Sequence, residues 1–121
     1  MRAPAIVMKP GPHFTPAQLT IVQQVLQRGL PSSARAIVFG SRATGIGLKP
    51  HSDLDLLLDT PAPLPLAALA DLREAFSQSD LPFAVDLLER QDATPEFLAR
   101  IAAAGSCPLA LPGHAATTAG A

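Results

Sequence analysis

Two segments of this chain decide its fold: Phe39-Gly40-Ser41-Arg42-Ala43-Thr44-Gly45 and Ser52-Asp53-Leu54-Asp55-Leu56. The first follows the run 34–39, whose β-favouring end predicts a strand that leads straight into Gly40-Ser41. The second opens the leucine-rich run 53–59, which predicts a central strand buried on both faces. Both polar motifs are therefore expected at the ends of neighbouring strands.

The flanking segments predict the remaining elements. Thr15-Pro16-Ala17-Gln18 is a capping box with proline at the first helical position, and it predicts a helix over 16–28. Apolar spacing predicts a helix over 66–77 and a strand over 83–88. A second Thr-Pro start predicts a final helix over 95–105. This order is typical of an α/β (α+β) fold, a short mixed β-sheet with helices packed on one face.

Length and composition indicate one domain. The 121 residues are 48% hydrophobic, enough for a core, but only 4% aromatic, so leucine, valine, isoleucine and alanine must build it. We predict a domain over 15–105, a Pro-rich N-terminal segment over 1–14 and a weakly ordered C-terminal tail over 106–121. Residues 5–8 in the first segment are compatible with a short edge strand.

Charge and residue usage exclude several classes of protein. The net charge is −1 and the nine basic residues are scattered, which argues against direct nucleic-acid binding. The one cysteine, Cys107, fits a reducing compartment. No apolar run is long enough to span a membrane, and the N-terminus does not resemble a signal peptide. These features predict a soluble, cytoplasmic protein.

Two carboxylates lie two residues apart in the second motif. Such residues point to the same side of a strand, so Asp53 and Asp55 are predicted to lie side by side. Like charges on a mostly buried strand repel each other and lose hydration, and a divalent cation would offset both effects. Ligands that are all oxygen atoms favour Mg²⁺ or Mn²⁺ over zinc.

A third carboxylate, Asp86, lies in an otherwise apolar strand. If its apolar neighbours face the helices, Asp86 faces the opposite side of the sheet and lies next to Asp53 and Asp55. Three carboxylates on one face are typical of a two-metal site, in which the ions activate an attacking oxygen and stabilise the leaving group. We therefore predict Asp53, Asp55 and Asp86 as metal ligands and catalytic residues.

The first motif predicts an anion site. Glycine at position 40 allows phosphate to approach the backbone closely, and the Ser41 hydroxyl can donate a further hydrogen bond. Arg42 is interpreted either as a phosphate ligand, because of its planar fork, or as an ordinary surface residue. Asp59 and Glu89, which end their strands, are predicted to be solvated.

The two motifs together resemble the minimal nucleotidyltransferase (MNT) family of the polymerase-β-type superfamily. The resemblance implies a polymerase-β-like core in which Gly40 and Ser41 bind the triphosphate of ATP. It also implies that Asp53 and Asp55 ligate two Mg²⁺ ions, with Asp86 ligating one ion or helping to deprotonate the acceptor hydroxyl. The loop between Ser41 and Asp53 is one residue longer than in many members.

Many such minimal domains resemble the antitoxin of a toxin–antitoxin pair. The resemblance then implies a hetero-oligomer with a HEPN-type ribonuclease toxin, and transfer of AMP from ATP to a tyrosine of that toxin. Two alternatives stay open at this point. One is an antitoxin that neutralises its partner by binding alone, and the other is an adenylyltransferase for a small molecule such as an aminoglycoside.

Overall fold

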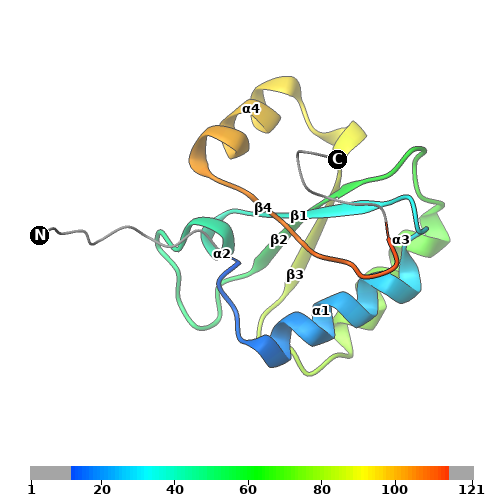
Figure 1. Cartoon of the computed structure of the whole chain (residues 1–121), viewed down its shortest axis with the longest axis horizontal. Coiled ribbons are helices and arrows are strands. Elements are labelled where there is room, and N and C mark those ends of the chain that lie inside the picture. Colours follow the sequence, from blue (N-terminus) through cyan, green and yellow to red (C-terminus); the bar gives the residue numbers. More distant parts are fainter. Residues whose placement is uncertain (1–11, 115–121) are drawn as a thin grey trace, which may run out of the picture.

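A four-stranded mixed β-sheet in the order β3-β2-β1-β4 organises the chain in the computed structural model, which describes residues 12–114 (Figure 1). The strands are β1 Arg35–Phe39, β2 Leu54–Asp59, β3 Val85–Glu89 and β4 Cys107–Pro108. The helices are α1 Pro16–Gly29, α2 Ser41–Thr44, α3 Leu66–Ser77 and α4 Pro95–Ala104, and the 3₁₀ turn η1 Arg90–Asp92 links β3 to α4. The predicted fold class is confirmed, and each long element lies within two residues of its predicted bounds.

The pairing of the strands explains how the two motifs meet. β1 and β2 are antiparallel, and Phe39 is the register partner of Asp55. The Gly40-Ser41 turn therefore begins where β2 starts. β3 runs parallel to β2, with α3 as the crossover, and β4 pairs antiparallel with the other edge of β1.

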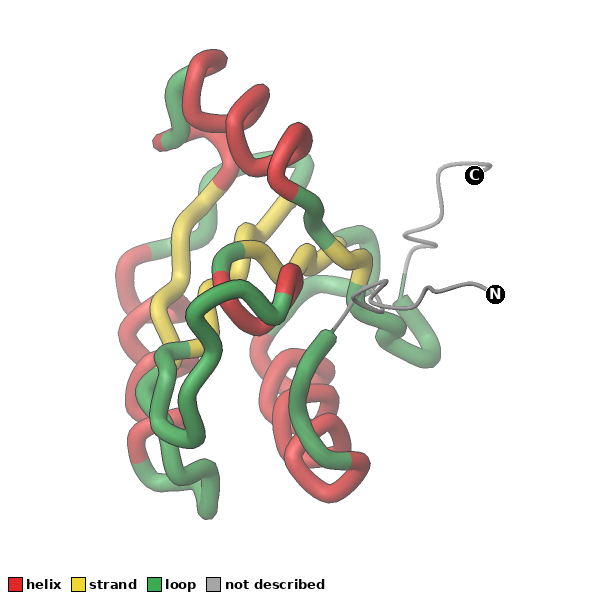
Figure 2. The backbone as a smooth tube through the Cα atoms, turned by 90° about the vertical axis from the view of Figure 1, so that its left-hand side faces the viewer, coloured by secondary structure: helices red, strands yellow, loops and turns green. Residues whose placement is uncertain are grey.

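One face of the sheet forms the hydrophobic core with α1 and α3. Alternate residues of β1 and β2 are fully buried there, and they pack with apolar side chains from both helices. These strand residues are Ala36, Val38, Leu54, Leu56 and Leu58. Figure 2 shows α1 and α3 on this side of the strands and α4 on the other.

Helix α1 shows how local sequence and packing agree. The predicted capping box is present, because the Gln18 amide donates to the Thr15 hydroxyl and the Thr15 amide donates to the Gln18 side chain. Gly29 ends the helix, and a Cβ atom there would collide with the Leu72 side chain of α3. The absence of a side chain at Gly29 therefore lets α1 approach α3 closely.

Helix α4 departs from the prediction that the helices cover one face. It lies over the opposite face, where Phe97 makes an edge-to-face contact with Phe39 at a centroid distance of 5.6 Å. Although α4 has an apolar stripe, none of its residues is buried. Sequence spacing identifies an apolar stripe but cannot say which face of a sheet the stripe will meet.

The prediction of a weakly ordered tail from residue 106 is wrong for the described part of that segment. β4 adds to the sheet, and Leu109 and Leu111 are 1% and 5% exposed. The side chains of Gln23 and Gln27 on α1 donate hydrogen bonds to the carbonyls of Ala110 and Pro112 at 2.8 and 2.7 Å. The small residues and prolines of this segment show no clear periodicity, so the sequence did not reveal that long-range contacts would order it.

Two sequence-based expectations concern segments at the ends of the chain. The edge strand considered at 5–8 and the tail beyond 114 lie outside the described residues. Within 12–114, no helix is long and apolar enough to cross a membrane.

Candidate active site

The Gly40-Ser41 motif forms a sharp turn between β1 and α2. Gly40 has φ +74° and ψ −155°, a backbone conformation that is essentially restricted to glycine. A Cβ atom at this position would collide with Oδ2 of Asp55. The turn therefore needs glycine for its backbone angles and also for the close approach of the Asp55 carboxylate.

Helix α2 begins at this turn and is a single helical turn long. The amides of Ala43 and Thr44 donate to the Gly40 carbonyl, whereas a helix leaves its first amides without intrahelical acceptors. Ser41 follows Gly40 directly and is half-buried. The turn at Gly40 lies against the Asp55 carboxylate, and the adjoining Ser41 offers a hydroxyl that can hydrogen-bond an anionic oxygen.

The three predicted carboxylates come together at this end of the sheet. Asp55 and Asp86 are register partners on the parallel strands β2 and β3. Asp53 lies immediately before β2 and is exposed, as is Asp86, whereas Asp55 is half-buried. The prediction that Asp86 lies next to Asp53 and Asp55 on a neighbouring strand agrees with this placement.

The environment of Asp55 disfavours its charged form. Burial is the largest cause, and the charges of Asp86 and then Asp53 add to it, so that the pKa of Asp55 is raised to about 6. Within residues 12–114, none of the three carboxylates forms a salt bridge. The carboxylates therefore form a focus of negative potential that a divalent cation would neutralise.

The carboxylates do not form a finished metal cage. Among residues 12–114, no three side chains from His, Cys, Asp and Glu are close enough together to hold a metal ion as they stand. Mutual repulsion keeps like-charged carboxylates apart when no cation is between them. The donor set is all oxygen, and the closeness of Asp55 to Asp53 and Asp86 fits a hard cation such as Mg²⁺ after small side-chain rotations.

Arg42 is buried in a set of contacts that the sequence did not reveal. It is 4% exposed, and its guanidinium donates to the carbonyls of Ser52, His13 and Pro50 at 2.9, 2.9 and 3.0 Å. The guanidinium also lies over the Phe83 ring, 3.8 Å from its centroid. The guanidinium of Arg42 thus makes its hydrogen bonds and its aromatic contact within the protein.

These contacts make Arg42 a positioning residue for the loop between the two motifs. Ser52 precedes Asp53, so Arg42 ties the start of the loop to the residue next to a predicted metal ligand. Burial lowers the pKa of Arg42, while the negative charge of Asp53 acts in the opposite direction. The placement supports neither the predicted phosphate contact nor the alternative of an ordinary surface residue.

The chain resembles known proteins both in sequence and in structure. A profile of the nucleotidyltransferase domain family matches residues 19–106. The chain belongs to this family. The matched range contains both motifs and all three carboxylates.

A curated relative supports the same assignment. The chain is 42% identical over 80 residues to a probable protein adenylyltransferase MntA of Haemophilus influenzae, which covers 66% of this chain and 68% of the relative. The chain is accordingly a nucleotidyltransferase enzyme, and the sequence-based resemblance to the minimal nucleotidyltransferases is confirmed.

Solved structures agree with the fold. A crystal structure of a toxin–antitoxin with AMP-PNP matches with a TM-score of 0.61 at 22% identity, over 77% of this chain and 73% of that one. A complex of tri-AMPylated Shewanella oneidensis HEPN toxin with MNT antitoxin matches with a TM-score of 0.57 at 20% identity, over 78% and 71%. At these identities the likeness establishes the nucleotidyltransferase fold.

Proposed function

We propose that this nucleotidyltransferase transfers AMP from ATP to a tyrosine hydroxyl of a HEPN-type ribonuclease toxin and acts as the antitoxin of that pair. The observation that carries the proposal is the cluster of Asp53, Asp55 and Asp86 beside the Gly40-Ser41 turn. The MntA relative is named as a probable protein adenylyltransferase, which supports a protein acceptor over a small molecule. Such a function belongs in the cytoplasm, where ATP and RNA are found.

The turn and the carboxylates would divide the work of binding ATP. Backbone amides at the start of α2 and the Ser41 hydroxyl would hold phosphate oxygens. Asp53, Asp55 and Asp86 would hold two divalent cations, Mg²⁺ or Mn²⁺. When bound, these ions neutralise the triphosphate and polarise the phosphorus that is attacked.

The reaction exchanges one phosphorus–oxygen bond for another. The tyrosine oxygen attacks the α-phosphorus of ATP, the bond from that phosphorus to the bridging oxygen of the β-phosphate breaks, and pyrophosphate leaves. The proton of the tyrosine hydroxyl passes to a carboxylate of the cluster, which is Asp86 if that residue acts as the base rather than as a metal ligand. The product is a tyrosine–AMP phosphodiester.

Within residues 12–114, helix α4 partly covers the sheet face beside the carboxylates (Figure 2). The proposed reaction needs an acceptor hydroxyl at this face. A partner protein that brings its own tyrosine to this face meets that need. The small-molecule alternative lacks a corresponding acidic or enclosed acceptor cleft within residues 12–114.

The test is incorporation of labelled AMP from ATP into a purified HEPN-type partner in the presence of Mg²⁺. Asp53→Asn should abolish incorporation, whereas Asp71→Asn, at an exposed position of α3, should retain it. Mass spectrometry of the labelled partner should locate AMP on tyrosine. Incorporation that is equal in wild type and Asp53→Asn would refute the proposal.

An antitoxin that acts by binding alone predicts a different result for variants of the carboxylates. If Asp53→Asn/Asp55→Asn inhibited the ribonuclease activity of the partner as fully as wild type, and in the absence of ATP, inhibition by contact would replace inhibition by modification. Measuring ribonuclease activity before and after ATP addition separates the two functions.

A further inference from the structure

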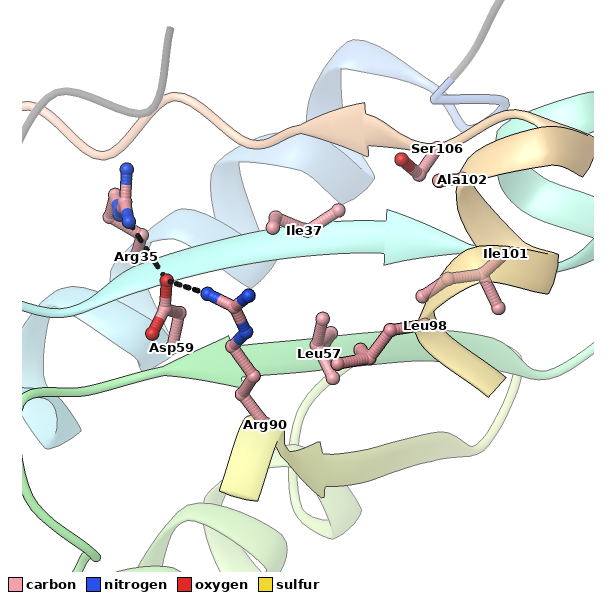
Figure 3. A pocket seen from close by; sticks show the side chains of 9 residues that line it. All are labelled: Arg35, Ile37, Leu57, Asp59, Arg90, Leu98, Ile101, Ala102 and Ser106. Atoms are coloured by element: carbon pink, nitrogen blue, oxygen red, sulfur yellow. Dashed lines mark hydrogen bonds and ion pairs between the residues drawn. The ribbon is translucent and has the colours of Figure 1, made fainter. Parts of the chain in front are cut away.

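A cavity of about 240 Å³ lies between α4 and the sheet face that carries the active site (Figure 3). Ile37 of β1 and Leu57 of β2 form its apolar floor, and Leu98 and Ile101 of α4 form an apolar wall. Pockets for small molecules usually measure about 300–1,000 Å³. This cavity therefore suits one or two protein side chains better than a nucleotide.

Two arginines line the far end of the cavity and share one carboxylate. The guanidinium groups of Arg35 and Arg90 donate to the same atom, Oδ2 of Asp59, at 2.9 and 3.4 Å. The side chains of the two arginines are 41% and 54% exposed. The cluster carries one net positive charge, and each fork has five N–H donors, so donors remain for an incoming anionic group.

The apolar side of α4 is incompletely covered by its own chain. Helix α4 has a well-defined apolar stripe but no buried residue, in contrast to α1 and α3. A helix of this kind in a soluble protein usually gains its stability by burying such a stripe. The stripe residues Leu98 and Ile101 are partly buried, and they form an apolar wall of the cavity that also contains the two arginines.

The cavity is also close to the reacting groups. Leu57 follows Asp55 by two residues on β2 and lies on the same face, which corresponds to about 7 Å along the strand. A partner that delivers a tyrosine to Asp55 and Asp86 must therefore cover the neighbourhood of this face. The position of the cavity thus continues the acceptor side of the proposed active site.

We propose that this cavity, lined by Ile37, Leu57, Leu98 and Ile101 and rimmed by Arg35 and Arg90, is the docking site for the protein that carries the acceptor tyrosine. The partner inserts an apolar side chain into the cavity and places a neighbouring Asp or Glu on the two arginines. This inference rests on the proposed function for the identity of the partner. The inference concerns where the partner binds and adds no step to the reaction.

Two variants test the two halves of the interface. Leu98→Gln/Ile101→Gln makes the apolar wall polar, with the exposed Leu66→Gln on α3 as its control, since Leu66 is 85% exposed. Arg90→Glu reverses the charge at the rim, with Arg73→Glu on the exposed side of α3 as its control. Thermal melting and circular dichroism of every variant check that the fold is retained.

The partner is the HEPN-type protein used in the AMP-transfer assay, and its binding is measured by calorimetry on the full chain. We expect Leu98→Gln/Ile101→Gln and Arg90→Glu each to weaken binding by about tenfold or more, and the controls by less than about twofold. In transfer assays the same variants should raise KM for the partner, with kcat and KM for ATP unchanged. Added NaCl should weaken wild-type binding more than that of Arg90→Glu.

Equal binding by cavity variants and their controls would overturn the inference, whether or not AMP is transferred. Conversely, loss of binding in the cavity variants with no AMP transfer by wild type would support the docking site and refute the proposed function. A rise in KM for ATP without weaker partner binding would assign the cavity to the nucleotide and would also overturn the inference.

Discussion

Asp55 and Asp59 lie on the same strand and point to the same face of the sheet, but their surroundings are opposite. Asp59 accepts hydrogen bonds from Arg35 and Arg90 at one end of the face. Asp55 lies at the other end among Asp53 and Asp86, whose charges help to raise its pKa to about 6. Within residues 12–114, the charge of Asp59 is balanced by ion pairs, whereas Asp55 forms no ion pair.

The difference separates a structural carboxylate from a functional one. A carboxylate that finds its cation in the fold contributes to stability and has little need of a ligand. A carboxylate that faces like charges destabilises the folded protein until an external cation binds. Substitutions that exchange or remove these surroundings should therefore change activity at one end and stability at the other.

The largest expected effect is the loss of catalysis in Asp55→Asn. Removing this charge should lower the rate of AMP transfer by about 1,000-fold, on the order of 4 kcal/mol, because the site loses a predicted metal ligand. Without Mg²⁺, the same variant should melt at a higher temperature than wild type, because the like-charge repulsion is gone. Rate assays and melting curves in EDTA measure the two effects, and a variant that is both active and less stable would contradict the comparison.

Gly40→Ala should follow, with transfer lowered by about 100-fold and stability by about 1–3 kcal/mol. The new Cβ occupies the space of the Asp55 carboxylate, and the backbone conformation is strained as well. Gly47→Ala is the matched control, because Gly47 has φ +70° but no atom within 4 Å of an added Cβ. Comparable losses of activity in both variants would show that strain alone, and not displacement of Asp55, is responsible.

Arg42→Lys should lower kcat by about tenfold and leave KM for ATP nearly unchanged. Lysine keeps the charge but cannot donate to three carbonyls at once, so the loop that ends at Asp53 is held less firmly. Arg35→Lys, at the other end of the face, is the control and should keep normal kcat. If KM for ATP rose while kcat stayed constant, Arg42 would instead contact phosphate, as first predicted.

The pH dependence of stability should also differ between the two ends. The pKa of Asp55 is raised in the folded protein, so its folded form binds a proton more tightly than the unfolded form does. Stability from this group is therefore present at pH 4 and lost as the pH rises through about 6. After allowance for solvent screening, the loss is about 1 kcal/mol. Melting in EDTA should show wild type and Asp55→Asn alike at pH 4 and separated at pH 7, and a constant gap would oppose the assignment.

The smallest expected effect belongs to Asp59→Asn, which should cost about 0.5–1 kcal/mol of stability and leave the rate of transfer unchanged. The two arginines lose their shared carboxylate, but both are largely exposed and remain hydrated. Urea unfolding at low and high salt measures the change, which should shrink as salt screens the ion pairs. A large fall in kcat, as distinct from a rise in KM for the partner, would show that this end of the face takes part in catalysis.

The sequence predicted the placement of the three carboxylates well because that placement is encoded locally. The spacing of Asp53 and Asp55, and the parallel placement of Asp86, follow from the period of a strand and from the order of the elements. The Gly40-Ser41 turn is likewise a short-range feature. Local rules therefore located the carboxylates and the turn without knowledge of packing.

The sequence could not predict features that depend on distant contacts. Glu89 was expected to be solvated, but it is 8% exposed and accepts a hydrogen bond from the Leu64 amide at 2.8 Å. Asp59 was also expected to be solvated and is instead ion-paired. The partners of Glu89 and Asp59, like the carbonyls around Arg42, come from segments that only the folded chain brings near.

Helix α4 is held to the sheet without any fully buried residue, and this affects which parts of such a protein can change in evolution. Because α4 buries none of its residues, local opening of this helix should cost less free energy than opening of the sheet, and its amides should exchange with solvent earlier. Substitutions in α4 should therefore lower the free energy of unfolding of the whole chain only slightly. At the docking site proposed above, mutation of α4 can therefore change partner choice without altering the predicted metal ligands.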